Sequence, residues 1–111
     1  MTIFQMILDR KIPADIVYED EHAIAFRDIN PQAPVHVLVI PAAHLRDAAE
    51  LAVADPELAG RLLATAAQVA ESEGLASGYR IVLNTGADAG QTVFHVHAHV
   101  LGGRDLLWPP G

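Results

Sequence analysis

The chain has 111 residues, of which 51% are hydrophobic, and it carries a formal net charge of −7 and no cysteine. This size predicts a single domain, residues 1–111, with one hydrophobic core. The charge argues against nucleic-acid binding, which needs clustered lysine and arginine, and the lack of cysteine excludes disulfides and cysteine-ligated zinc.

The start of the chain lacks the features of a signal peptide, because it has no basic segment and reaches a charged residue at Asp9. No apolar run is long enough to span a bilayer. We therefore expect a cytoplasmic protein that has no membrane partner.

Residues 3–10 are predicted to form a short amphipathic helix. Phe4, Ile7 and Leu8 follow one another at the i, i+3, i+4 spacing of one helix face, and Thr2 is a suitable N-cap. These side chains are expected in the core, although an apolar wall of this kind also suits the flat base of a nucleotide.

Three strands are expected next, over residues 16–20, 22–28 and 35–40, because these segments are rich in β-branched and aliphatic residues and are bounded by turns. The third strand is apolar on both faces except at His36. This pattern predicts a central strand that is covered on both sides. A weak helix is expected after it, over residues 44–54.

The clearest helix signal is Asp55-Pro56-Glu57, which combines an N-cap, a proline in the first turn and an acidic residue near the positive end of the helix dipole. This helix should run to about Glu73 and stop at Gly74. Its buried stripe is predicted to be apolar and rich in alanine: Leu58, Leu62, Ala66, Val69 and Ala70.

The last two predicted strands cover residues 79–84 and 95–101, and the loop between them contains Gly86 and Gly90. Most of the five expected strands follow one another through short turns. The sheet should therefore be largely antiparallel and the fold class α+β, with a five-stranded sheet, one long helix and short helices.

The final strand carries the main chemical signal, which is histidine at alternate positions, His95, His97 and His99. In a strand these side chains share one face, roughly 6.7 Å apart at a rise of about 3.3 Å per residue, and Val96 and Ala98 pack on the other face. Three imidazoles on one face indicate either a zinc or copper site, or nucleophilic catalysis by one histidine with the others orienting it or moving protons.

Other residues are candidates for the same site. His36 is a possible fourth histidine, and the glycine-containing loop either exposes N–H groups to phosphate oxygens or serves only as a tight turn. Asp28 either caps a turn or accepts hydrogen bonds from ribose hydroxyls. His22 and His44, which lie beside turns, are expected to be solvated. Trp108, alone in a proline-rich tail, is expected to dock, for instance on a partner subunit.

The segment His95-Val96-His97-Ala98-His99-Val100-Leu101 resembles the motif of the histidine triad (HIT) superfamily, in which histidine alternates with hydrophobic residues. The third histidine separates the chain from the nucleotidylyltransferase branch, which has glutamine there. The resemblance to the Hint branch, the histidine triad nucleotide-binding proteins, extends over nearly the whole chain, at Ile12-Pro13, residues 28–34, 39–41, 78–80, Asn84, 90–94, 101–104 and 108–111.

This resemblance implies a homodimer in which two five-stranded sheets join into one ten-stranded sheet. It also implies a metal-independent purine nucleoside phosphoramidase without a cofactor, which hydrolyses adenosine 5′-phosphoramidates to AMP and an amine through a nucleotidyl-histidine. The expected ligands are purine nucleotides such as AMP, GMP or a phosphoramidate.

The resemblance also implies a role for individual residues. His97 is the expected nucleophile, and His36, His95 and His99 are its hydrogen-bonding and phosphate-binding partners. Thr92 stands where relatives have serine and keeps the hydroxyl that can protonate the leaving amine. The residues implied in nucleotide binding are Asp28 at the ribose, Asn84, Gly90 and Gln91 at the phosphate, Phe4, Ile7, Ile12, Phe26 and Ile29 at the base, and Trp108 from the neighbouring subunit.

Three alternatives stay open at this point. The chain could act on a dinucleoside polyphosphate or another nucleotidyl substrate of the same superfamily. It could be a zinc- or iron-dependent hydrolase or oxygenase with a histidine-only site. It could also be a nucleotide-binding regulatory module whose role is to bind a protein partner.

Overall fold

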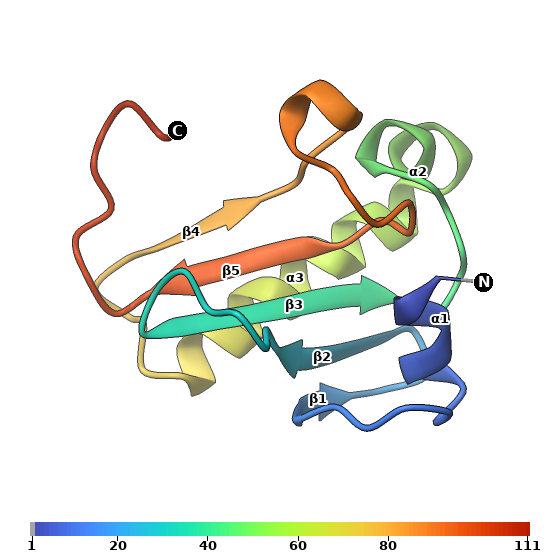
Figure 1. Cartoon of the computed structure of the whole chain (residues 1–111), viewed down its shortest axis with the longest axis horizontal. Coiled ribbons are helices and arrows are strands. Elements are labelled where there is room, and N and C mark those ends of the chain that lie inside the picture. Colours follow the sequence, from blue (N-terminus) through green and yellow to red (C-terminus); the bar gives the residue numbers. More distant parts are fainter. Residues whose placement is uncertain (1) are drawn as a thin grey trace.

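Five strands form one antiparallel sheet in the computed structural model, which describes residues 2–111 (Figure 1). The elements in chain order are α1 Ile3–Leu8, β1 Ile16–Glu19, β2 Ala23–Arg27, β3 Val35–Pro41, α2 Ala48–Ala54, α3 Pro56–Ser72, β4 Tyr79–Val82, the short 3-10 helix η1 Ala87–Ala89 and β5 Ala98–Gly102. The strands lie in the order β1-β2-β3-β5-β4, and every neighbouring pair is antiparallel. The predicted α+β class and the central position of β3 are confirmed.

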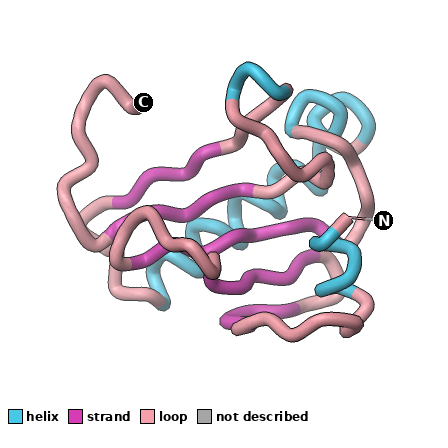
Figure 2. Tube along the Cα trace, in the orientation of Figure 1, coloured by secondary structure: helices cyan, strands magenta, loops and turns pink. Residues whose placement is uncertain are grey.

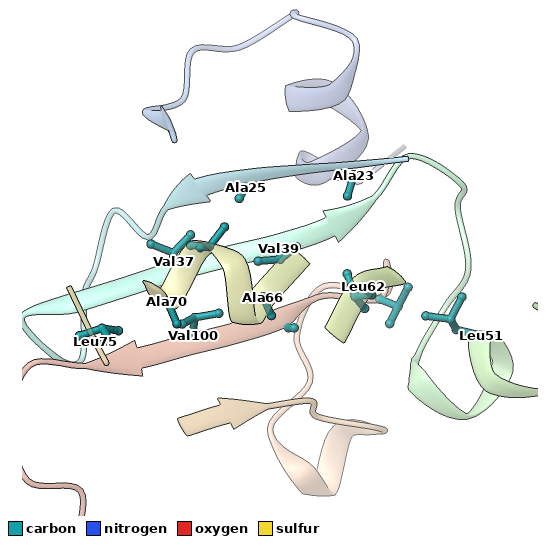
Figure 3. Close-up of a cluster of buried hydrophobic side chains, with 13 residues drawn as sticks. Ala23, Ala25, Val37, Val39, Leu51, Leu62, Ala66, Ala70, Leu75 and Val100 are labelled. Atoms are coloured by element: carbon teal, nitrogen blue, oxygen red, sulfur yellow. The ribbon is translucent and has the colours of Figure 1, made fainter. Parts of the chain in front are cut away.

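Helix α3 covers one face of the sheet. Its N-terminus is capped as predicted, because the Asp55 carboxylate accepts a hydrogen bond from the Leu58 N–H, and Pro56 occupies the first turn. The helix ends before Gly74, whose φ of +80° is a left-handed conformation that favours glycine. The small side chains of α3 allow it to lie close to the sheet, where Ala66 and Ala70 pack over β3 and β5 (Figure 3).

Helix α1 lies against the opposite face, close to the N-terminal end of the described chain (Figure 2). The Thr2 hydroxyl caps it by accepting from the Gln5 N–H. A second apolar cluster joins this helix to strands β2 and β3, and its buried members are Phe4, Ile7, Ile24, Phe26, Leu38 and Ile40. Within residues 2–111, no helix combines the length and the apolar character that crossing a membrane requires.

Most element boundaries differ from the predicted ones by one or two residues, and two elements begin three or more residues later than predicted. Helix α2 begins at Ala48 and not at residue 44, because the buried Asp47 carboxylate caps it by accepting from the Glu50 N–H. Strand β5 begins at Ala98, so His95 and His97 precede it in irregular extended backbone. Continued past Val39 and Ala98, the register places Pro41 opposite Val96. Because proline has no N–H to donate to the neighbouring strand, the ladder of hydrogen bonds stops before this pair.

Candidate active site

A cavity of about 440 Å³ opens between α1, strand β2 and the segment that leads into β5. Its walls are mostly apolar, and its polar side chains are few: Arg27, Asp28, Thr92, His97 and His99. This volume and this lining are typical of a small-molecule site, in which apolar walls hold the ligand and a few polar groups orient it.

The cavity brings together the five residues that were expected to wall a base, which are Phe4, Ile7, Ile12, Phe26 and Ile29. Phe4 and Phe26 meet edge to face, with 5.7 Å between ring centroids. Phe4 also meets the His97 ring edge to face at 4.8 Å. One aromatic side chain of α1 therefore joins the apolar wall to the histidines.

His97 is held in one tautomer by the backbone. Its Nδ1 lies 2.8 Å from the carbonyl oxygen of His95 and must donate to it, so Nε2 keeps the lone pair in the neutral ring. Burial lowers the pKa of His97, although the His95 carbonyl and Asp28 partly oppose the shift. The ring is therefore neutral near pH 7 and offers the cavity a nucleophilic nitrogen.

His36 and His99 form a second hydrogen-bonded pair beside it. The backbone N–H of Gln32 donates to His36 Nδ1 at 3.0 Å, so the neutral His36 ring carries its proton on Nε2. This Nε2 lies 2.9 Å from His99 Nδ1. His99 therefore accepts at Nδ1 and carries its own proton on Nε2, which makes it a donor at the edge of the cavity.

Burial also keeps these two rings neutral. It lowers the pKa of His36 below its ordinary value, while the nearby Asp28 acts in the opposite direction. The pKa of His99 falls to about 4, first because of burial and then because His97 and His36 lie close to it. Of these uncharged imidazoles, only His99 has an N–H, at Nε2, left to donate to a phosphate oxygen, because His36 Nε2–H donates to His99 and His97 Nε2 has a lone pair.

Asp28 caps a turn and also borders the cavity. One carboxylate oxygen caps the turn by accepting from the Asn30 N–H at 2.8 Å, and the other lies 3.5 Å from His36 Nε2. The side chain also borders the cavity. It therefore remains available to hydroxyl groups of a ligand.

Asp28, His36 and His99 place one ligand atom each within 4.8 Å of one another, which is close enough to consider a metal ion. The hydrogen bond from Gln32 opposes this use of the site. Because His36 Nδ1 accepts that bond, its Nε2 carries the proton and has no lone pair to give to a metal. The residues therefore do not fit a metal at this point.

His95 differs from the other two triad histidines. Its ring is fully buried, does not border the cavity and donates from Nε2 to the carbonyl oxygen of Pro41 at 3.1 Å, while Nδ1 has no partner among the described residues. Burial lowers its pKa. The contact with Pro41 gives the His95 ring an anchoring role, and a contact between His95 and a phosphate stays a prediction.

In the loop before the triad, the residues expected at the phosphate make contacts within the protein or form a turn. Gln91 is buried, and its side chain is occupied by Gly86, Arg46 and Val93. The Asn84 amide donates to the Ala89 carbonyl, and Gly90 has a φ of +90° that a tight turn requires. None of Asn84, Gly90 and Gln91 borders the cavity, whereas Thr92 does.

Trp108 lies outside the cavity of its own chain. Its side chain is 83% exposed, in a tail that runs beside β4 at the opposite end of the molecule from α1 (Figure 1). Any contact of Trp108 with a nucleotide therefore requires a second subunit.

Sequence reasoning missed two groups. Gln32 acts through its backbone N–H, which no side-chain pattern reveals. His44 is exposed, as expected, and in addition its Nε2 lies 3.0 Å from the Phe94 carbonyl oxygen and its ring stacks on that of His95. The only sequence signal for this role of His44 was that a histidine follows the predicted strand 35–40 by four residues.

Residues 9–106 match the family described as the HIT domain. The chain belongs to the HIT family. An uncharacterized HIT-like protein of Synechococcus elongatus is 56% identical over 99% of this chain and 96% of its own length. A protein of Zea mays named 14 kDa zinc-binding protein is 50% identical over 99% of this chain and 88% of its own.

Solved HIT structures share the fold closely. A HIT family hydrolase from Legionella pneumophila superposes with a TM-score of 0.95 at 45% identity, and all of both chains is covered. A histidine triad nucleotide-binding protein from Candida albicans superposes with a TM-score of 0.86 at 27% identity, covering 96% of this chain and 77% of that one. The cavity with its histidines is therefore a feature of a chain whose whole length has the HIT fold.

Proposed function

We propose that this HIT protein is a purine nucleoside phosphoramidase, which hydrolyses adenosine 5′-phosphoramidates to AMP and an amine without a metal. The observation that carries the proposal is His97, which borders a cavity with apolar walls and whose Nε2 keeps its lone pair. The Legionella relative named a hydrolase and the Candida relative named nucleotide-binding support the same reaction class.

The reaction proceeds in two steps. In the first, His97 Nε2 attacks the α-phosphorus, a P–Nε2 bond forms and the P–N bond to the amine breaks. The leaving nitrogen takes a proton from the Thr92 hydroxyl, which borders the cavity and is reprotonated by solvent water. In the second, water attacks phosphorus, the P–Nε2 bond breaks with its electron pair returning to His97, and the water proton leaves to solvent.

The neighbouring groups support both steps. The Nε2–H of His99 donates to a phosphate oxygen and stabilises the charge that develops there, and His36 holds His99 in that tautomer. Asp28 accepts hydrogen bonds from the ribose hydroxyls, and the base lies between Phe4 and the other apolar walls.

The test is a rapid-quench search for a covalent nucleotidyl-protein with adenosine 5′-phosphoramidate, followed by identification of the modified residue. We expect the label on His97, and we expect His97→Ala to abolish turnover while AMP binding stays within about fivefold, because the ring contributes one contact to the ground state. Undiminished turnover in that variant would refute the proposal. Activity should survive a chelator, and calorimetric AMP binding without hydrolysis would favour a binding module instead.

We also infer that two copies associate through β4. This strand lies at the edge of the sheet, and beside it an apolar groove on α3 of about 580 Å³ is bordered by Ala64, Ala67, Gln68, Glu71, Leu75, Ala76 and Tyr79. Exposed sheet edges are templates for pairing with another strand. Light scattering should give twice the mass of the 11.9 kDa chain, and a mass of one chain at micromolar concentration would contradict the inference.

A further inference from the structure

The segment that precedes β5 is anchored by the loop that follows β3. Because residues 91–97 lie outside the sheet, their backbone groups need partners elsewhere. We call residues 41–46 the clamp, because four of them make hydrogen bonds to this segment, two to its backbone groups and two to its side chains. The contacts are His95 Nε2 to the Pro41 carbonyl at 3.1 Å, His44 Nε2 to the Phe94 carbonyl at 3.0 Å, the Val96 N–H to the Leu45 carbonyl at 2.7 Å, and Gln91 Nε2 to the Arg46 carbonyl at 2.8 Å.

One peptide unit connects the clamp to the nucleophile. The N–H of Val96 and the carbonyl of His95 belong to the same planar peptide and point in opposite directions. The N–H donates to Leu45 in the clamp, and the carbonyl accepts the Nδ1–H of His97 at 2.8 Å. A rotation of this plane would move the His97 ring, so the clamp determines where Nε2 lies in the cavity.

His44 is the clamp side chain that holds the preceding peptide. Its Nε2 faces a carbonyl oxygen and must therefore be an N–H donor to Phe94. Its ring stacks on that of His95, with centroids 4.7 Å apart and planes 17° apart. The ring is largely exposed and does not border the cavity, so it cannot contact a ligand there.

We propose that His44 is a positioning residue, which orients the nucleophile through the Phe94 and His95 peptides. This inference rests on the proposed function, because it assigns His44 to the step that His97 performs. Positioning of this kind acts on the transition state more than on the bound ligand. Displacing reacting atoms by about 1 Å can cost about 100-fold in rate, so the loss of a single tether should be visible in kcat.

The test compares His44→Phe, which keeps a stacking ring but removes the N–H, with His44→Gln, which keeps an N–H at the ε position. For His44→Phe we expect kcat to fall at least about tenfold with KM and AMP affinity nearly unchanged. For His44→Gln we expect kcat within about threefold of that of the original chain, because the hydrogen bond to the Phe94 carbonyl is kept. His22→Phe is the matched control and should leave kcat unchanged, because the side chain of His22 pairs with Glu21. Its contact with the clamp, from the Ala42 N–H to the His22 carbonyl, is made by the backbone and survives the substitution.

Ring ¹⁵N NMR of the histidines gives a readout that needs no turnover. We expect His97 protonated at Nδ1 in the original chain and in His44→Gln, and a mixture of tautomers in His44→Phe. Equal kcat and the same His97 tautomer in all variants would overturn the proposal, as would an equal loss in His44→Gln. If the original chain hydrolyses no phosphoramidate, the proposed function fails, while the tautomer of His97 still tests the clamp.

Discussion

Replacing Gln91 by leucine tests whether this side chain supports the loop or binds the phosphate. Gln91 is 3% exposed, and its amide makes three hydrogen bonds, at 2.9 Å from the Gly86 N–H, 2.8 Å to the Arg46 carbonyl and 3.1 Å to the Val93 carbonyl. At about 1 kcal/mol for each hydrogen bond, Gln91→Leu should lower the free energy of unfolding by about 3 kcal/mol. For a domain of this size, that loss corresponds to a Tm lower by about 12 °C.

The assay is thermal and urea unfolding, with AMP affinity measured by calorimetry below the transition. Gln5→Leu is the matched control, because it removes one exposed hydrogen bond to Asp9 and should shift Tm by less than about 2 °C. If Gln91→Leu kept its Tm but lost AMP affinity, the side chain would contact phosphate and the structural assignment would be wrong. We expect Gln91→Leu to have a lower Tm and an unchanged affinity of the folded protein for AMP.

Two further predictions concern the cavity. The free energy of unfolding should fall as pH drops from about 6.5 towards about 4. The pKa values of four histidines are lowered in the folded chain, so the unfolded chain binds more protons in this range: His36, His95, His97 and His99. Urea titrations at several pH values check this, and a flat profile would contradict it. Asp28→Asn should raise KM for the phosphoramidate about tenfold, because it removes a charge-assisted hydrogen bond to the ribose, and it should abolish discrimination against a 2′,3′-dideoxy substrate. A variant that still preferred the ribose substrate over the dideoxy substrate would place the ribose elsewhere.

Local patterns in the sequence predicted most elements because their causes are local. The continuous apolar run of β3 predicted a strand covered on both sides, and Val37 and Val39 do pack on one face and Leu38 and Ile40 on the other. Asp55 with Pro56 marked the start of α3. Such signals act within a few residues. The same reasoning extended β5 back to His95, because the alternation of histidines continues beyond the point where Pro41 interrupts the ladder.

The residue types of the site were readable for the same reason. Three histidines in alternation, a carboxylate at the end of β2 and an apolar helix face all come from short stretches, and the structure gathers His97, His99 and Asp28 with that face around one cavity. Their protonation states were not readable. The tautomer of His36 depends on the backbone N–H of Gln32, and that of His97 on the His95 carbonyl.

What the sequence alone determined is most of the inventory of secondary structure, the face on which a side chain lies within a strand and the chemistry that those side chains can perform. Tertiary structure alone decided which of them meet. His36 and His99 are 63 residues apart and touch because β3 and β5 are neighbours, and His44 reaches Phe94 across 50 residues. The physical reason is that hydrogen bonds depend on distance and direction in space, which pairing of distant segments creates and no short stretch of sequence contains.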